Sequence, residues 1–353
     1  MKKKRNIYLT IISLLIVLGV ITYAHFTFDA YKLRILNLCA VYTVLGLSMN
    51  LIYGFTGLFS LGHAGFMAVG AYATALLTLP VALKAQNFFL KPIVEPLANV
   101  VWPFFPSLLF AGLLTAFIGF LIGAPALRLK GDYLAIATLG FAEIIRIIII
   151  NAQTVTNGAL GLKGIPATTN LWWSFGTAAV TIIFMIFLIN SSYGRAFKAI
   201  REDEIAAESM GISLFKHKVL SFTIGAFFAG IGGGLLGNLL GTIDPALFKF
   251  TLTFNILLII VLGGIGSITG TVISAFIVTI AGEVLRFLDQ SINLGFVVIP
   301  GVTGMRMVVF SLLLMIVVLF FRHGLMGTNE FDWDRLIDML SSFKKPLRKR
   351  RES

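Results

Sequence analysis

Two pairs of oppositely charged residues lie inside otherwise apolar segments of the sequence. Glu143 is followed three residues later by Arg146, and Glu283 is followed in the same way by Arg286. On a helix this spacing places the two side chains of each pair one turn apart, where they can form an ion pair. Ionisable residues within a membrane segment are also candidates for a transport path, and a zwitterionic amino acid needs both charges. The sequence leaves both interpretations open.

No pattern in the sequence supports catalysis or metal binding. The four histidines are scattered without metal-ligand spacing, and no nucleotide-binding, hydrolase or dinucleotide-binding motif occurs. The single cysteine, Cys39, excludes a disulfide within the chain. We therefore expect no catalytic residue, no metal and no cofactor in this chain.

One long charged stretch, residues 191–218, interrupts the apolar sequence. Its candidate contact residues are Gly194, Arg195, Arg201, Glu202, Asp203, Glu204, Ala206, Ala207 and Gly211. Such a stretch cannot lie in hydrocarbon, so it predicts a water-exposed loop that contacts a partner. We expect a short helix ended by Gly211, with Ile200, Ile205 and Met210 docking into the partner. A lipid-facing helix is the alternative, and the acidic residues of the stretch argue against it.

Two glycine-rich turns have similar spacing, GFTGLFSLGHAG at residues 54–65 and GGIGSITG at residues 263–270. Their candidate residues are Gly57, Ser60, Gly62 and His63 in the first turn and Gly264, Gly266, Ser267 and Gly270 in the second. Small residues let helices approach closely, and paired turns also fit an internal duplication of the kind found in transporters. We expect His63 to pack or to form hydrogen bonds, with a gating role as the alternative.

The composition is that of an integral membrane protein. Of the 353 residues, 58% are hydrophobic and 12% are charged, against about 25% charged residues in soluble domains. Apolar runs of about 20 residues favour helices over the strands of a barrel. The net charge of +12 comes from basic residues in the tails and loops, which fits membrane topology and lipid head groups better than nucleic acid.

We predict an all-α, polytopic transmembrane fold of about ten spans, within a range of nine to eleven. The expected spans are residues 7–25, 33–53, 58–80, 104–127, 132–151, 171–190, 219–241, 251–266, 269–288 and 303–321. The first of them reads as an uncleaved helix rather than a signal peptide. Because most lysines and arginines fall in the tails and alternate loops, both termini are expected in the cytoplasm.

The predicted organisation is a transmembrane domain, residues 1–321, and a cytoplasmic tail, residues 322–353. Within the tail, residues 331–343 have an apolar helical face, and residues 344–351 are nearly all basic. An interfacial helix followed by an anionic-lipid anchor fits this pattern, and so does a solvated end.

Several blocks of the sequence resemble the bacterial branched-chain amino-acid permease family of ABC importers. These blocks are LGLSMNLIYGFTGLFSLGHAGFMAVGAY (45–72), RLKGDYLAIATLGFAEIIR (128–146), NGALGLKGIP (157–166), Asp244-Pro245 through LGGIGSITG, and RAFKAIREDEIAAESMGI within the charged stretch. The resemblance favours the longer, M-type permease subunit over the shorter H-type partner. The importer signature E-A-A-x-x-x-G is partly kept, with Ala206, Ala207 and Gly211 in place and Ile205 at the glutamate position. Glu204 stands one residue earlier, so the acidic residue that faces the ATPase is left open.

The resemblance implies a permease subunit that moves Leu, Ile and Val across the bacterial inner membrane by alternating access. Its implied partners are a second permease subunit in a heterodimer, two cytoplasmic ATPase subunits that carry ATP and Mg²⁺, and an extracytoplasmic amino-acid binding protein. Residues 191–218 would be the loop that couples to the ATPase.

Two other functions remain as alternatives. One is a urea or short-amide permease of the same superfamily. The other is a stand-alone, ion-coupled secondary transporter, which would need a buried acidic site near the middle of a span.

Overall fold

The computed structural model describes residues 2–129 and 131–286. Further along it describes only residues 292–293, 298–299, 305, 308–309, 311–312, 315, 319, 324–327, 330 and 334. The predicted span at 303–321 and the predicted tail helix and basic end at 331–351 lie outside the described residues, apart from isolated positions.

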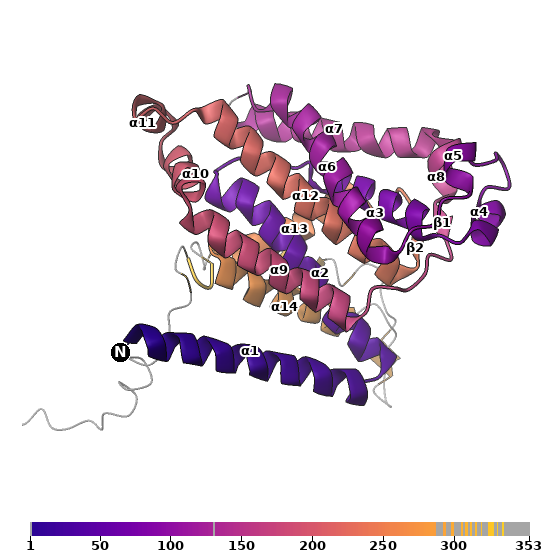
Figure 1. The fold of residues 1–353 in the computed structure, drawn as a ribbon, viewed down its shortest axis with the longest axis horizontal. Helices are drawn as coiled ribbons and strands as arrows, with labels where there is room; N and C mark the ends of the chain where they lie inside the picture. The colour runs from indigo at the N-terminus through magenta and orange to yellow at the C-terminus, as the bar shows by residue number, and fades with distance from the viewer. Residues whose placement is uncertain are drawn as a thin grey trace, which may run out of the picture.

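The described chain is a bundle of long helices (Figure 1). These helices are α1 (Lys2–Thr27), α2 (Ala30–Asn50), α3 (His63–Thr78), α6 (Phe104–Ala126), α7 (Asp132–Asn151), α9 (Leu171–Asn190), α12 (Leu214–Leu240), α13 (Phe250–Gly263) and α14 (Ile268–Val284). Each coincides with one of the spans predicted before residue 303, with ends that differ by a few residues. The largest differences are at the first residues of α1, α3 and α12, each five residues from the predicted span start at 7, 58 or 219.

Short elements connect the long helices. They are a π-helical turn η1 (Leu51–Phe55), α4 (Val81–Asn87), α5 (Glu95–Ala98), α8 (Gln153–Thr156), a 3₁₀ turn η2 (Gly158–Leu160), α10 (Ser192–Glu202), α11 (Glu204–Ser209), and the strands β1 (Leu162–Lys163), β2 (Thr242–Ile243), β3 (Ile292–Asn293) and β4 (Val298–Ile299). Strands β1 and β2 pair antiparallel, with Leu162 opposite Ile243, and β3 pairs with β4 in the same sense.

Five of the described helical segments are long and apolar enough to cross a membrane. They are α2 together with η1 (Ala30–Phe55), α6, α7, α9 and α12. The segment Leu15–Thr27 of α1, together with α13 and α14, is apolar but shorter than 18 residues. The fold is therefore that of a helical membrane protein, and the number of spans stays a prediction.

The centre of the bundle is the crossing of α12 with α3. A Cβ added at Gly70 of α3 would lie 2.0 Å from the carbonyl oxygen of Gly230, and one added at Gly233 would lie 2.1 Å from that of Met67. Only glycines allow two helix backbones to come this close, which is how membrane helices gain packing contacts. The α12 helix also packs against α2 and α6.

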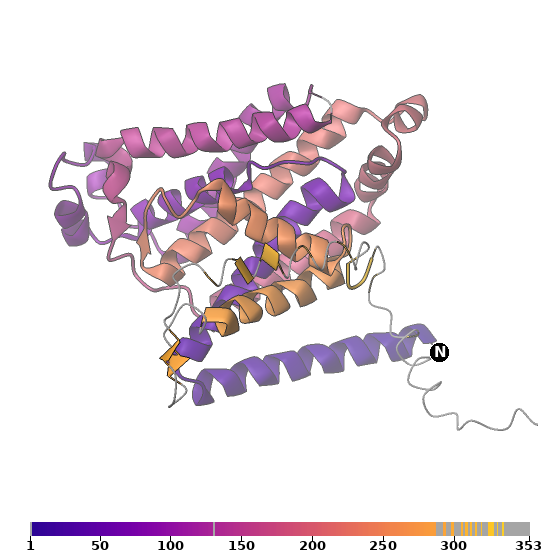
Figure 2. The ribbon, with the colours of Figure 1, turned by 180° about the vertical axis from the view of Figure 1, so that it is seen from behind.

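The two ends of the bundle carry different elements. Figure 1 shows α10 and α11 at the end where α1 begins, and α4, α5, α8 and the β1–β2 pair at the opposite end. Seen from behind, α1 runs along one edge of the bundle (Figure 2). The charged stretch thus lies at the same end as the N-terminus, as the predicted topology requires.

Candidate functional site

The charged stretch folds into two short helices, α10 and α11, rather than the single helix expected. The break is at Asp203, whose carboxylate accepts hydrogen bonds from the backbone N–H groups of Ile205 (2.8 Å) and Ala206 (3.0 Å). Asp203 is therefore the N-cap of α11, a position that strongly favours aspartate. Gly211 follows α11 with a φ of +83°, so the predicted glycine stop is present.

The exposed surface of α10 and α11 differs from the predicted contact surface at three residues. Ile205 is 79% exposed and Met210 is 83% exposed, as docking into a partner would require. Gly194, Ile200 and Ala207 are buried within this chain, with Ile200 2% and Ala207 3% exposed. The expectation that these three residues face a partner is wrong, because they lie on the sides of α10 and α11 that pack against the rest of this chain.

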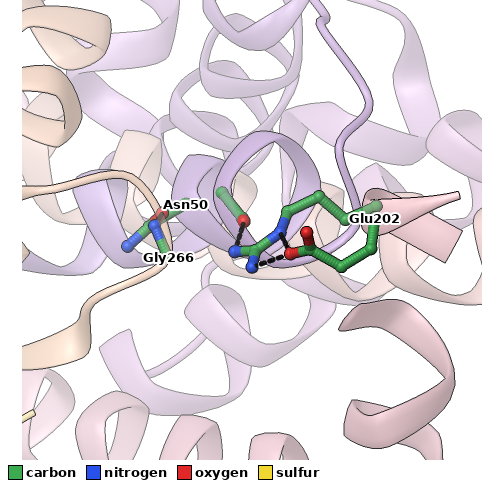
Figure 3. Close-up of polar contacts among 5 residues, drawn as sticks. Asn50, Glu202 and Gly266 are labelled. Carbon is green, nitrogen blue, oxygen red and sulfur yellow. Dashed lines mark hydrogen bonds and ion pairs between the residues drawn. The ribbon is translucent and has the colours of Figure 1, made fainter. Parts of the chain in front are cut away.

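Arg201 connects α10 with both glycine-rich turns (Figure 3). Its Nη1 donates a hydrogen bond of 2.9 Å to the carbonyl oxygen of Gly54, and its Nε donates one of 3.0 Å to Oε1 of Glu202. A Cβ added at Gly57 would lie 3.1 Å from Cγ of Arg201, and one added at Gly266 would lie 2.6 Å from its Nη1. The guanidinium therefore lies directly against residues of both turns.

Asn50, the last residue of α2, joins the same two turns. Its Oδ1 accepts a hydrogen bond of 3.0 Å from the N–H of Gly266, and its Nδ2 donates to the carbonyl oxygen of Ser267 (2.9 Å) and to Oγ1 of Thr271 (2.7 Å). Asn50 is fully buried. We call Asn50, Gly54, Arg201 and Gly266 the turn cluster. The sequence analysis missed Asn50, although a lone amide at the end of an apolar span is a recognisable signal.

The second glycine-rich turn is also held from the C-terminal side. The N–H groups of Leu325 and Met326 donate to the carbonyl oxygens of Leu262 (2.8 Å) and Gly263 (3.0 Å). The carboxylate of Glu330 accepts from the N–H groups of Ile268 (2.7 Å) and Thr269 (3.0 Å), at the N-terminus of α14 where a negative charge is favourable. In the same turn Ser267 caps α14 by accepting from the N–H of Gly270 (3.0 Å).

The first glycine-rich turn is held mainly by side-chain hydrogen bonds. His63 is buried, with its Nε2 at 2.8 Å from Oγ of Ser48, in keeping with a packing and hydrogen-bonding role. Ser60 accepts from the N–H of Gly62 at 3.3 Å. The hydroxyl of Thr253 on α13 accepts from the N–H of Ala64 at 3.0 Å. Both turns are thus fixed in place by neighbouring helices.

Both predicted charge pairs form in the structure. On α7, Nε of Arg146 donates to Oε1 of Glu143 at 2.9 Å. At the end of α14, Nη1 of Arg286 donates to Oε1 of Glu283 at 3.0 Å, and the hydroxyl of Tyr31 donates to the same oxygen at 2.6 Å. The ion pairs predicted from the helical spacing are therefore confirmed, and a role of either pair in the transport path stays a prediction.

At the other end of the bundle, a buried lysine forms hydrogen bonds to the backbone of a long connecting segment. Lys84 on α4 is 1% exposed and donates to the carbonyl oxygens of Leu97 (2.8 Å) and Val100 (2.6 Å). Burial lowers the pKa of this ammonium group from its usual value. Three residues along, Asn87 bonds to the backbone of Lys163 in β1 through both ends of its amide. These contacts join the two long connections, residues 81–103 and 152–170, into one surface.

Comparison with known proteins gives a consistent set of similarities. Residues 31–319 match a family described as the permease component of the branched-chain amino acid transport system. The chain is 35% identical over 290 residues to the high-affinity branched-chain amino acid transport system permease protein LivM of Escherichia coli, covering 72% of this chain and 64% of that relative. No solved structure matches the chain.

Two more distant relatives extend the comparison. The LivH permease protein of Salmonella typhimurium is 26% identical over 320 residues, with 84% of this chain and 94% of the relative covered. The probable LivM of Methanocaldococcus jannaschii is 24% identical, with 72% and 81% covered. The chain spans about two thirds of the length of the LivM protein of E. coli, at 64%.

Proposed function

This chain belongs to the permease-component family of branched-chain amino acid transport systems, and from that membership we propose that it is a permease subunit of an ATP-driven importer. Its proposed substrates are leucine, isoleucine and valine, which it moves across the bacterial cytoplasmic membrane by alternating access. The chain breaks no bond itself, and ATP and Mg²⁺ bind in separate ATPase subunits. Both of its termini lie in the cytoplasm in this proposal.

The observation that carries the proposal is the position of the coupling loop, α10 and α11. This loop presents Ile205, Ala206 and Met210 outward on one side, and on the other side Arg201 bonds to Gly54 and lies against Gly266. A loop with an exposed apolar surface and a rigid inner attachment suits a subunit that receives movement from a cytoplasmic partner.

The turn cluster gives that movement a physical route. Gly54 lies in η1 at the end of α2, and Gly266 lies in the turn between α13 and α14. Displacement of α10 by an ATPase subunit would pull on both turns at once through Arg201, since the side chain contacts both. The π-helical turn at the end of α2 suits this role, because such turns are local deviations that occur often at functional sites.

The remaining partners in the proposal follow from the relatives. Because relatives named LivM and LivH are both permease proteins, we propose that this chain pairs with a second permease subunit and that the path lies between them. An extracytoplasmic amino-acid binding protein would dock on the surface that Lys84 and Asn87 organise. Two ATPase subunits would bind at the opposite end.

The experiment that tests this proposal is co-purification from the native membrane. The chain, tagged at its N-terminus, is expected to bring down a second permease and an ATPase that carries G-x-x-x-x-G-K-[ST], with hydrolysis stimulated by binding protein loaded with leucine. Recovery of the chain alone from gently solubilised membranes, with no ATP hydrolysis, would contradict the proposal and favour a stand-alone transporter.

A further inference from the structure

A cavity of about 400 Å³ lies between α2, α12, α13 and α14. This volume is within the range of about 300–1,000 Å³ that is typical of small-molecule sites. On α2 its wall is formed by Arg34, Leu38 and Tyr42, which are spaced four residues apart and therefore share one helical face. On α14 the wall includes Gly282 and Glu283.

The wall of this cavity includes one positively charged and one negatively charged side chain. Arg34 has no hydrogen-bond or ion-pair partner among the described residues, whereas Glu283 is held by Tyr31 and Arg286. Tyr31 is one turn before Arg34 on α2, so its hydrogen bond of 2.6 Å to Glu283 brings that end of α2 against α14. A guanidinium and a carboxylate from two different helices therefore line the same cavity.

The rest of the cavity wall is mainly aliphatic. The aliphatic side chains are Leu38, Leu236, Leu240, Leu247, Leu252, Ile259 and Val278. Asn255 on α13 adds an amide. A site with one cationic group, one anionic group and branched aliphatic walls matches the chemistry of an α-amino acid with a branched aliphatic side chain, since apolar side chains gain free energy by leaving water.

We propose that this cavity is a binding site for the transported amino acid. Arg34 binds the carboxylate, Glu283 binds the ammonium group, and the leucines of α2, α12 and α13 surround the side chain. An arginine pairs with a carboxylate through two parallel hydrogen bonds, which fixes its orientation. The proposal rests on the proposed function, because it assumes that this chain lines the transport path.

A steric block tests the site directly. Gly282 lines the cavity, and a Cβ added there meets no other atom within 4 Å, so Gly282→Phe places a large side chain at the cavity wall without a backbone clash. Gly176 on α9 is equally open, and it does not line the cavity, so Gly176→Phe is the matched control. In vesicles containing the complete complex, Gly282→Phe is expected to lower leucine uptake more than tenfold, and Gly176→Phe is expected to leave it unchanged.

A charge change tests the assigned orientation. Arg34→Gln removes a charged hydrogen-bond donor, and the expected result is uptake lowered by about tenfold through a higher KM. Arg34→Lys should keep part of the affinity. Wild-type uptake in both Gly282→Phe and Arg34→Gln would overturn the inference. Loss of assembled complex in these two variants, but not in Gly176→Phe, would also overturn it and assign the cavity to packing against the second permease.

A third measurement separates failure of the site from failure of the proposed function. The native Cys39 is fully buried, so a thiol reagent applied to Gly282→Cys reports on the cavity alone, even in a complex that transports nothing. Leucine is expected to slow this labelling at least threefold, and urea at the same concentration is expected to have no effect. Equal labelling with and without leucine would contradict the site. Protection by leucine in vesicles without uptake would uphold the site and contradict the proposed function.

Discussion

At the scale of single residues, Arg201 has a role that a simple positive charge cannot fill. Its planar guanidinium donates in several directions at once, and here it donates to the carbonyl oxygen of Gly54 and to the carboxylate of Glu202. The space beside Gly266 is tight, because a Cβ there would lie 2.6 Å from Nη1 of Arg201. Lysine carries the same positive charge, but its ammonium group lacks the planar set of donors of a guanidinium, and its side chain is shorter.

We predict that Arg201→Lys uncouples transport from ATP hydrolysis. The contact with Gly54 is lost while the charge of the loop is kept, so the ATPase still docks but its movement is not passed on. ATP hydrolysis per complex is expected to stay near the wild-type rate, while leucine uptake falls roughly threefold to tenfold, the equivalent of one hydrogen bond.

The control for this prediction is Arg195→Lys. Arg195 is exposed on the same helix, and its side chain makes one long contact of 3.4 Å with the carbonyl oxygen of Asn190. Equal loss of uptake in both variants would show that α10 needs arginine for a general reason and would remove the special role of Arg201.

The pair Glu143–Arg146 gives a second prediction at this scale. If the pair is structural, Glu143→Gln leaves an arginine unpaired within an apolar helix and lowers the yield of assembled complex. Adding Arg146→Gln should then restore much of that yield. The measurement is the amount of complex recovered per cell. Normal yield with lost uptake in Glu143→Gln, unchanged by the second substitution, would instead assign Glu143 to the transport path.

The ion pairs predicted from the sequence join residues that are close together along the chain. Glu143 with Arg146 and Glu283 with Arg286 follow from spacing along one helix. Asn50 and Arg34 were missed, because their neighbours come from α13 and α14, more than 200 positions away in the sequence. The amide of Asn50 at the end of an apolar span is visible in the sequence, but the partners of both residues are revealed only by the packed structure.

At the scale of elements, the coupling loop is two helices set at an angle by the Asp203 cap. The sequence predicted an exposed loop and its glycine stop correctly. It placed Gly194, Ile200 and Ala207 on the wrong side. Gly194 and Ile200 lie on the buried face of α10, and Ala207 lies on the buried side of α11, which begins as a new helix after the cap at Asp203. The similarity of the two glycine-rich turns was also recognised in the sequence. Only the structure shows that the two turns lie next to each other.

Gly211 provides the prediction for this loop. Gly211→Trp places a large side chain beside the exposed surface of α11, and nothing in this chain lies within 4 Å of the new Cβ. In the proposed complex, the group that meets this side chain is the partner ATPase. We expect normal membrane insertion and loss of substrate-stimulated ATP hydrolysis, measured in the purified complex.

The matched control is Gly131→Trp. Gly131 also has a positive φ, +58° against +83° for Gly211, and it also has no neighbour within 4 Å. The backbone at Gly131 (φ +58°, ψ −136°) lies in a region that a side chain rarely adopts, so a loss confined to Gly211→Trp cannot be explained by backbone strain alone. Unchanged stimulation in Gly211→Trp, or equal loss in both variants, would remove the coupling role assigned to α11.

At the scale of the whole molecule, the two ends of the bundle have opposite tasks in this account. The end with α10 and α11 receives movement from the ATPase, and the end with α4 and β1 receives substrate (Figure 1). The alternation of long helices and the uneven distribution of basic residues predicted this arrangement. The contacts of Lys84 and Asn87, at the end of the bundle with α4 and β1, could not be predicted from the sequence. In the sequence both residues read as ordinary residues of a connecting segment.

Cysteine labelling tests this sidedness. Lys163 and Lys198 are both exposed, and the buried Cys39 contributes little background. In intact cells, an impermeant thiol reagent is expected to label Lys163→Cys and not Lys198→Cys, with both labelled after the membrane is permeabilised. The reverse pattern in intact cells would invert the topology.

The most direct test of the central claim is leucine uptake into vesicles that contain this chain with its permease, ATPase and binding-protein partners. We predict uptake that requires ATP and the loaded binding protein, and that continues when ion gradients across the membrane are dissipated. Uptake that continues without ATP and stops when an ion gradient is removed would contradict the account and identify an ion-coupled transporter.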